Sequence, residues 1–261
     1  MKKGLLLLTG YVRHNLMSAM EYRGAFWLQV FGMALNNTIF LFFWWVLFER
    51  LPDIQGWTLP MVATVFGLVA AAFGLANVFF GNCMRIASTV VSGDLDYYLA
   101  LPADPLLHLL VSRTQVSSWG DTISGFGIFL FLVPGSLAKL PMFVCYSLIG
   151  MLIFIGFSVL VGSLVFFLDQ SQDMVGYLYN ALISFSTYPI DIFPRVVRLL
   201  LYTVVPAAMI GALPARLLFD FRWDLLGAMV GFAVGILILG RALFYAGLRR
   251  YESGNRVTVR G

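Results

Sequence analysis

Long runs of apolar residues alternate along the chain with short charged segments. Residues 54–84 and 140–168 carry no formal charge and consist mostly of Leu, Val, Phe, Ile, Ala and Gly. About 20 apolar residues in a helix span a hydrocarbon core of roughly 30 Å, so each run is long enough to cross a bilayer. Backbone polar groups in lipid must pair within their own segment, so each crossing is expected to be one helix. The pattern predicts six membrane-spanning helices, at residues 25–48, 58–81, 116–134, 141–168, 174–188 and 223–247.

The first residues show a different periodicity. Apolar positions from Leu5 to Met20 recur at helical spacing, while Arg13 and Asn15 occupy other positions around the helix. This pattern predicts that residues 1–24 form an amphipathic helix that lies on the membrane surface.

Basic residues at the two ends of the chain orient the predicted spans. Cytoplasmic segments next to membrane helices are enriched in Lys and Arg. We therefore expect a multi-pass protein of the cell inner (cytoplasmic) membrane with both termini in the cytoplasm, which an even number of crossings satisfies. The residues concerned are Lys2, Lys3, Arg13 and Arg23 before the first span, and Arg241, Arg249, Arg250, Arg256 and Arg260 at or after the end of the last.

An apolar segment before the last span is interrupted by proline. Residues 199–215 are uncharged but contain Pro206 and Pro214, which disfavour a continuous helix. A seventh crossing would also place the C-terminal arginines outside the cell. We therefore expect residues 191–215 to form a re-entrant element that enters the outer leaflet and returns. The residues that mark it are Tyr188, Pro189, Pro194, Pro206 and Pro214.

The composition indicates a single membrane domain and gives no sign of a large soluble domain. The 261 residues are 60% hydrophobic and 11% charged, against roughly 45–50% and 25% in an ordinary soluble domain. Residues 1–261 are thus expected to form a single transmembrane domain in contact with lipid. The net charge of +4 does not indicate nucleic-acid binding, because the basic residues are not gathered on one polar face. Cys83 and Cys145 fall near opposite membrane faces, so two free thiols are expected.

Catalytic or metal-binding chemistry has little support. The histidines, His14 and His108, fall in predicted surface segments, and the acidic residues are scattered over loops. No G-x-x-x-x-G-K-[ST] phosphate-binding loop occurs, so the chain is not itself an ATPase of that class and is expected to hold no cofactor. No cluster of His, Cys and carboxylate has metal-ligand spacing. An integral-membrane lipid-modifying enzyme, a passive channel and a structural membrane subunit remain alternatives.

Three asparagines within predicted spans are candidates for lining a polar cavity. Asn36 and Asn37 lie in the middle of the first span, and Asn77 lies in the second. An amide side chain in lipid is costly, so at least one of the first two should face protein or a polar cavity. A structural hydrogen bond between helices is the alternative to contact with cargo.

One carboxylate lies about one turn inside the third predicted span. The positive end of the helix dipole, together with Arg113 or Arg85, would hold Asp121 ionised. The simpler alternative is an interfacial carboxylate at a helix start.

Glycines recur every fourth residue along the last span, at Gly227, Gly231 and Gly235. They place small residues on one helical stripe, where another helix can approach closely. We expect a helix contact within the chain, with dimerisation of subunits as the alternative.

The predicted cytoplasmic loop at residues 85–113 is too apolar for a solvated linker and too charged for a span. Gly93 can end one short helix, Asp94 can start another, and Pro102 can stop it. Asp104 and Pro105 then form an N-cap followed by Pro at the first helical position. The result is a short surface helix that a soluble partner could grip, or an amphipathic hairpin resting on the inner leaflet. Its candidate residues are Gly93, Asp94, Leu95, Asp96, Tyr97, Tyr98, Leu99 and Pro102.

Sequence motifs in this loop and before the last span resemble those of a known family. The chain resembles the ABC-2 type permeases, specifically six-span members that accompany a separate ATP-binding protein. The motifs are Gly93-Asp94-Leu95-Asp96 followed by Leu99, Pro102 and Asp104-Pro105, then Tyr188-Pro-Ile-Asp-Ile-Phe-Pro194, Val205-Pro-Ala-Ala208 and Leu213-Pro-Ala-Arg216.

The resemblance implies an all-α membrane fold like that of the type V exporters and a role as the permease subunit of an ATP-driven exporter. Two permease chains, identical or different, would pair with two cytoplasmic ATP-binding subunits, which carry the ATP and Mg²⁺. The helix at about residues 93–101 would dock on the ATPase, with Asp94, Asp96 and Tyr97 as its contacts. The cavity would be lined mainly by the first, second and fifth spans, and it would move a hydrophobic or amphipathic substrate by alternating access.

Overall fold

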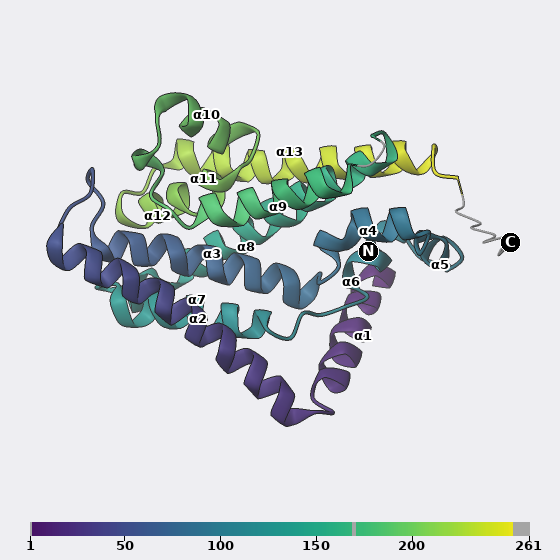
Figure 1. Cartoon of the computed structure of the whole chain (residues 1–261), viewed down its shortest axis with the longest axis horizontal. Coiled ribbons are helices and arrows are strands. Elements are labelled where there is room, and N and C mark those ends of the chain that lie inside the picture. Colours follow the sequence, from purple (N-terminus) through teal and green to yellow (C-terminus); the bar gives the residue numbers. More distant parts are fainter. Residues whose placement is uncertain (1, 169–170, 253–261) are drawn as a thin grey trace, which may run out of the picture.

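The computed structural model describes residues 2–168 and 171–252, and these ranges contain helices and no β-strand (Figure 1). The predicted all-α fold is therefore confirmed. Arg256 and Arg260, which entered the orientation argument, lie outside the described residues.

Helices occur at all six predicted spans, but they differ in length. Four of them are long and apolar enough to cross a membrane by themselves. The helices at the third and fifth positions have 15 residues each, and at 1.5 Å per residue such a helix is about 22 Å long. The count of six crossings therefore stays a prediction. The long helices are α2 (Arg23–Arg50), α3 (Leu59–Phe79), α8 (Ser136–Gly162) and α13 (Trp223–Leu248), and the short ones are α7 (Ser118–Leu132) and α9 (Gln172–Ser186).

The N-terminal helix α1 (Lys2–Ala19) precedes α2, as its pattern predicts. The cytoplasmic loop expected at residues 85–113 contains short helices, as does the segment between α9 and α13. The loop holds the 3-10 helix η1 (Cys83–Arg85), α4 (Ile86–Ser92), α5 (Leu95–Leu99) and α6 (Pro105–Val111). The later segment holds η3 (Ile190–Ile192), α10 (Arg195–Thr203), α11 (Ala207–Ile210) and α12 (Ala212–Phe219), and a further 3-10 turn, η2 (Ser163–Phe166), continues α8.

Proline explains where the helices between α9 and α13 begin. Pro194 immediately precedes α10, Pro206 immediately precedes α11, and Pro214 lies in the first turn of α12. A proline is tolerated at these places because the first helical N–H groups have no partner within the helix. The axes of α10 and of the pair α11–α12 differ by 68°. Such a bend fits a re-entrant element and fits a broken span equally, so the re-entrant assignment stays a prediction.

Helix α3 lies at the centre of the bundle, and its neighbours approach it closely. A Cβ built at Gly125 of α7 would lie 2.7 Å from both the amide nitrogen of Ala71 and the carbonyl oxygen of Gly67 on α3. On the other side of the bundle, a Cβ at Gly240 of α13 would lie 2.9 Å from the carbonyl oxygen of Gly156 on α8. Small residues therefore let these helix backbones touch, as in other membrane bundles.

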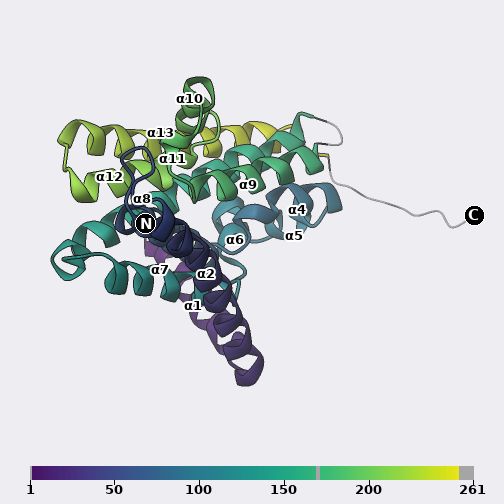
Figure 2. The ribbon, with the colours of Figure 1, turned by 60° about the vertical axis from the view of Figure 1, so that its left-hand side comes forward.

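The bundle has two ends with different contents. The first holds α4, α5 and α6 together with the C-terminal end of α13, and we call it the loop end (Figure 1). The second holds the α2–α3 connection and α10–α12, and we call it the far end. Helix α1 and the N-terminal end of α2 project from the bundle, whereas the rest of α2 packs on α7 and α3, and α1 leads back to α6 (Figures 1 and 2). The start of α1 and the end of α13 thus lie at the same end, as an even number of crossings requires.

The two cysteines are free, as expected. Cys83 is fully buried at the loop end, whereas Cys145 is exposed on α8. Burial raises the pKa of the Cys83 thiol to about 12.

Candidate functional site

The short helices of the loop begin and end where the sequence predicts. Gly93 follows α4 with a φ of 82°, a left-handed conformation that favours glycine. Asp94 stands at the start of α5, but its carboxylate accepts a hydrogen bond from the Ser92 hydroxyl at 2.7 Å rather than capping the helix. Asp104 does cap α6, since its Oδ1 accepts from the N–H of Leu107 at 3.0 Å, and Pro105 occupies the first turn.

Helix α5 has one buried anchor and an exposed face. Leu95 is fully buried. Tyr97 is 63% exposed and Leu99 is 38% exposed, and Asp94 is exposed beside them. Tyr98 is half-buried, and its hydroxyl lies 3.0 Å from the Ser112 Oγ. A helix fixed in this way presents a tyrosine, a leucine and an acid to solvent or to a partner.

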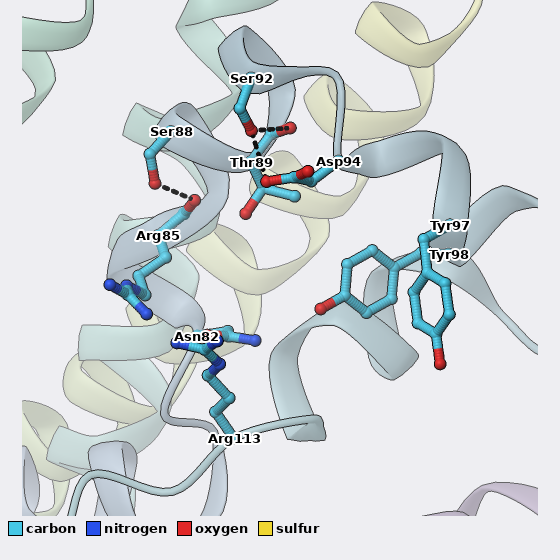
Figure 3. Close-up of a pocket in the computed structure, with 9 residues that line it drawn as sticks. All are labelled: Asn82, Arg85, Ser88, Thr89, Ser92, Asp94, Tyr97, Tyr98 and Arg113. Carbon is cyan, nitrogen blue, oxygen red and sulfur yellow. Dashed lines mark hydrogen bonds between the residues drawn. The ribbon is translucent and has the colours of Figure 1, made fainter.

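A cleft of about 680 Å³ separates α4 from α5 (Figure 3). Arg85 and Arg113 lie on one side of it, the rings of Tyr97 and Tyr98 lie on the other, and Asp94 lies between α4 and α5 (Figure 3). The lining therefore carries one more positive than negative charge. The remaining lining residues are Asn82, Ser88, Thr89 and Ser92.

The cleft is tied to the end of α3 through Asn82. Its side-chain amide donates to the carbonyl of Leu109 at 3.1 Å and to the hydroxyl of Ser112 at 2.6 Å. The N–H of Gly81 donates to the carbonyl of Arg113 at 3.0 Å. Hydrogen bonds therefore hold both ends of the loop next to the C-terminal end of α3.

The N-terminal helix contacts the same loop through His108. The sequence placed this histidine in a surface segment, and that prediction is wrong, because the side chain is buried and hydrogen-bonded to the Tyr11 hydroxyl. The Asn15 amide also donates to the carbonyl of Val111 at 3.3 Å. Burial lowers the pKa of His108. The apolar residues on both sides of His108 in α6 were the signal that could have revealed this burial.

The last helix contacts the loop as well. Arg241 of α13 forms an ion pair with Asp104 at 3.1 Å, and the Tyr251 hydroxyl donates to the carbonyl of Gly93 at 3.4 Å. Burial alone would raise the pKa of the Asp104 carboxyl, but hydrogen bonds, including that from Leu107, and the charge of Arg241 hold it below its usual range. Sequence reasoning did not anticipate this link, because the ion-pair partners are far apart in the chain.

A second cavity, of about 300 Å³, lies among α2, α3, α7 and α9. Asn36 and Asn37 line it, and Asn37 is buried, as expected for at least one of the pair. Asn77 is not among its lining residues. The Asn77 amide donates to the carbonyl of Phe73 at 3.0 Å, and its own carbonyl accepts from the N–H of Gln115 at 3.0 Å.

Asp121 has a different partner from the one expected. Its Oδ1 accepts a hydrogen bond from the Asn37 amide at 2.9 Å. Neither Arg85 nor Arg113 forms an ion pair with it in the described part of the chain. The expected arginine contact is therefore wrong, because both arginines line the cleft at the loop end.

Charged residues cluster at the far end around Asp191. Arg198 donates to its Oδ1 at 2.8 Å, and Trp57 Nε1 donates to its Oδ2 at 2.8 Å. Arg216 forms an ion pair with the same carboxylate and stacks over the Trp57 ring at 5.1 Å. This cluster joins η3, α10, α12 and the α2–α3 connection. The prolines of this segment were predicted to be important, but the Asp191 cluster was not.

The residues predicted to mark this segment lie where the chain turns. Tyr188 and Pro189 follow the end of α9, and the Tyr188 ring packs against Phe40 and Trp44 of α2. Pro194, Pro206 and Pro214 stand at the helix starts already described.

The glycine stripe of α13 does not make the contact expected within the chain. A Cβ at Gly227, Gly231 or Gly235 would have no described atom within 4 Å. Gly240 approaches α8 instead. Contact of the stripe with another subunit stays a prediction.

One comparison with known proteins finds a match. A family model described as ABC-2 family transporter protein matches residues 34–255. No curated protein and no solved structure matches the chain.

Proposed function

The chain belongs to the ABC-2 family of transporter proteins, and we propose from this premise that it is the permease of an exporter, driven through α5 by a cytoplasmic ATPase. As a family member it is a multi-pass transmembrane subunit that pairs with an ATP-binding subunit. The proposal adds the direction of transport, the docking helix and the assembly. The complex holds two ATP-binding subunits, with their ATP and Mg²⁺, and two permeases, identical or different, in the inner membrane with both termini cytoplasmic.

The observation that supports the docking site is that α5 has a buried anchor residue and an exposed face. It is anchored by buried Leu95, exposes Tyr97 and Asp94, and borders a cleft that contains two arginines. A docking helix needs a presented face and a firm base, since a loose helix would absorb the partner's motion.

Contacts of the loop suggest how motion reaches the membrane helices. Asn82 connects it to the end of α3, and Asp104 connects it to Arg241 of α13. When the ATPase subunits close, displacement of α5 pulls on both helices. The permease pair then alternates between inward-open and outward-open states, and ATP shifts this equilibrium only by its different affinity for the two states of the complex. The cargo is hydrophobic or amphipathic.

Reversal of charge on α5 tests the docking site. Asp94→Lys combined with Asp96→Lys should weaken association with the cognate ATP-binding subunit by about tenfold or more, since like charges placed across an interface cost several kcal/mol. Association is measured by co-purification and by titration of the labelled ATPase onto the permease in nanodiscs. ATP hydrolysis by the complex is recorded in the same samples.

Glu49→Lys combined with Asp220→Lys is the matched control, because both acids are exposed and lie away from the loop. It makes the same change of charge and should leave association unchanged. The α5 variant must also keep the wild-type melting temperature. Normal binding and normal ATPase stimulation by that variant would exclude α5 as the docking site.

A further inference from the structure

Asp121 is a buried carboxylate with an unused oxygen. The residue is 5% exposed, and its Oδ1 accepts a hydrogen bond from the Asn37 amide at 2.9 Å. Oδ2 is buried and has no hydrogen-bond partner among the described residues. A buried acceptor without a partner loses the hydrogen bonds that water would give it, which costs several kcal/mol for a charged group. Ionisable residues in membrane helices usually face a functional cavity for this reason.

This carboxylate lies on the wall of the 300 Å³ cavity. Three aromatic rings line the same space, from Phe40 of α2 and from Phe66 and Phe73 of α3. Ser184 and Thr187, at the end of α9, add hydroxyl groups. The cavity therefore combines an apolar wall with a few polar groups, the composition typical of a small-molecule site.

The charge of the lining selects the kind of ligand. No Lys or Arg lines the cavity, and none pairs with Asp121 in the described ranges. An anion would therefore meet a carboxylate without a compensating charge. An ammonium group would supply the positive charge that the Asp121 carboxylate lacks. The faces of the phenylalanine rings also attract cations.

We propose that this cavity binds the protonated amine of an amphipathic cargo, with the Asp121 carboxylate as its counter-ion and Asn37 as the residue that holds the carboxylate in place. The assignment rests on the proposed export function and narrows its substrate class. The Asn37 amide also donates to the Ser124 hydroxyl at 2.7 Å, so α2 and α7 together fix the orientation of the carboxylate.

A pair of fluorescent probes that differ only in charge tests the proposal. Dansylcadaverine carries a primary amine on an apolar fluorophore, and its N-acetyl derivative is neutral. Binding of each to the permease–ATPase complex in nanodiscs is followed by dansyl fluorescence. We expect the amine to bind at least about tenfold more tightly than its acetylated form, a difference of about 1.4 kcal/mol. Asp121→Asn should abolish this preference.

Asp173→Asn is the matched control, because Asp173 is an exposed acid in the first turn of α9. It should keep the preference of the wild type. Basal ATP hydrolysis and co-purification of the complex are measured in parallel, so a failure of the export assembly is distinguished from a failure of amine binding. If Asp121→Asn does not fold, binding of the two probes to the wild-type complex still tests the proposal. Equal affinity for dansylcadaverine and its N-acetyl derivative overturns it. An unchanged preference in a folded Asp121→Asn complex overturns it as well.

Discussion

His108 joins the N-terminal helix to the cytoplasmic loop. Its ring is hydrogen-bonded to Tyr11 of α1 and packs against the ring of Tyr98 at a centroid distance of 5.7 Å. Its Nδ1 is buried without a partner among the described residues. Protonation would place a charge in this buried contact with the rings of Tyr11 and Tyr98, so neutral histidine is the form that fits.

The lowered pKa of His108 predicts a pH-dependent stability. In the unfolded chain the histidine binds a proton as the pH falls through its ordinary value of 6.5, whereas the folded chain resists protonation. The unfolded state then holds more protons, so the contribution of His108 is fully present above pH 6.5 and is lost as the pH falls below it. We expect the melting temperature to fall as the pH is lowered from about 7.5 to about 5.5, because protonation of His108 then favours the unfolded chain.

Intrinsic tryptophan fluorescence during heating measures this change. His108→Gln should remove most of the pH dependence. His14→Gln, which changes an exposed histidine of α1, should retain it. Identical pH profiles for wild type and His108→Gln would contradict the assignment.

The roles of single residues were predicted correctly where local backbone conformation determines the residue type. Gly93, Asp104 and Pro105 have turn and cap roles that depend on neighbouring residues only, and each lies where expected. Asp121 was paired with the wrong residue because its partner, Asn37, is 84 positions away in the chain. Composition and spacing contain no information about such a contact.

At the scale of the helix, the close approach of α7 to α3 gives a direct test of helix packing. Gly125 lies against the backbone of α3, whereas a Cβ at Gly127, two residues further along α7, would have no described atom within 4 Å. Gly125→Ala should destabilise the fold by about 1–3 kcal/mol through overpacking. Gly127→Ala should be neutral or stabilising by up to about 1 kcal/mol, because alanine favours helix.

Thermal unfolding of the two variants in the same detergent checks this prediction. Both make the same chemical change on the same helix, so the control is internal. Equal melting temperatures would show that α3 and α7 are less closely packed than the structure has them.

Helix ends were more predictable than helix faces. Proline and glycine determine where a helix starts or stops, which explains the agreement in the loop and before α13. The four-residue spacing of Gly227, Gly231 and Gly235 defines a stripe but does not say what lies opposite it. Within the chain, Gly156 and Gly240 supply the close contact between α8 and α13 instead.

For the whole molecule, each end of the bundle is held by its own ionic contacts. At the far end, Asp191 is the shared acceptor of Arg198, Arg216 and Trp57. Asp191→Asn should destabilise the chain by about 1 kcal/mol, since two half-exposed arginines lose their partner while water still reaches them. It should also speed proteolytic cleavage between α9 and α13.

Asp220→Asn is the comparison variant, because Asp220 is an exposed acid at the same end. Limited proteolysis and melting temperature are measured for both variants. Cleavage of Asp191→Asn at the wild-type rate would mean that the Asp191 cluster does not hold α10 and α12 in place.

The sequence predicted helices at the six apolar segments, since hydrophobic length determines where they form. It did not predict which side chains face a cavity. Trp27, Leu28 and Phe31 of α2 are largely exposed, whereas Phe40 of the same helix lines the cavity. Lipid-facing and cavity-facing aromatic residues have the same composition, so only the packing of the helices separates them.

The contact between α1 and α6 has a mechanical consequence. With α1 resting on the bilayer surface, as its amphipathic pattern predicts, any tilt or sinking of that helix is passed through Tyr11 and Asn15 to the loop that carries α5. If α5 docks on the ATP-binding subunit as proposed, the thickness and headgroup charge of the surrounding lipid would then influence the orientation of α5, and with it the rate of ATP hydrolysis.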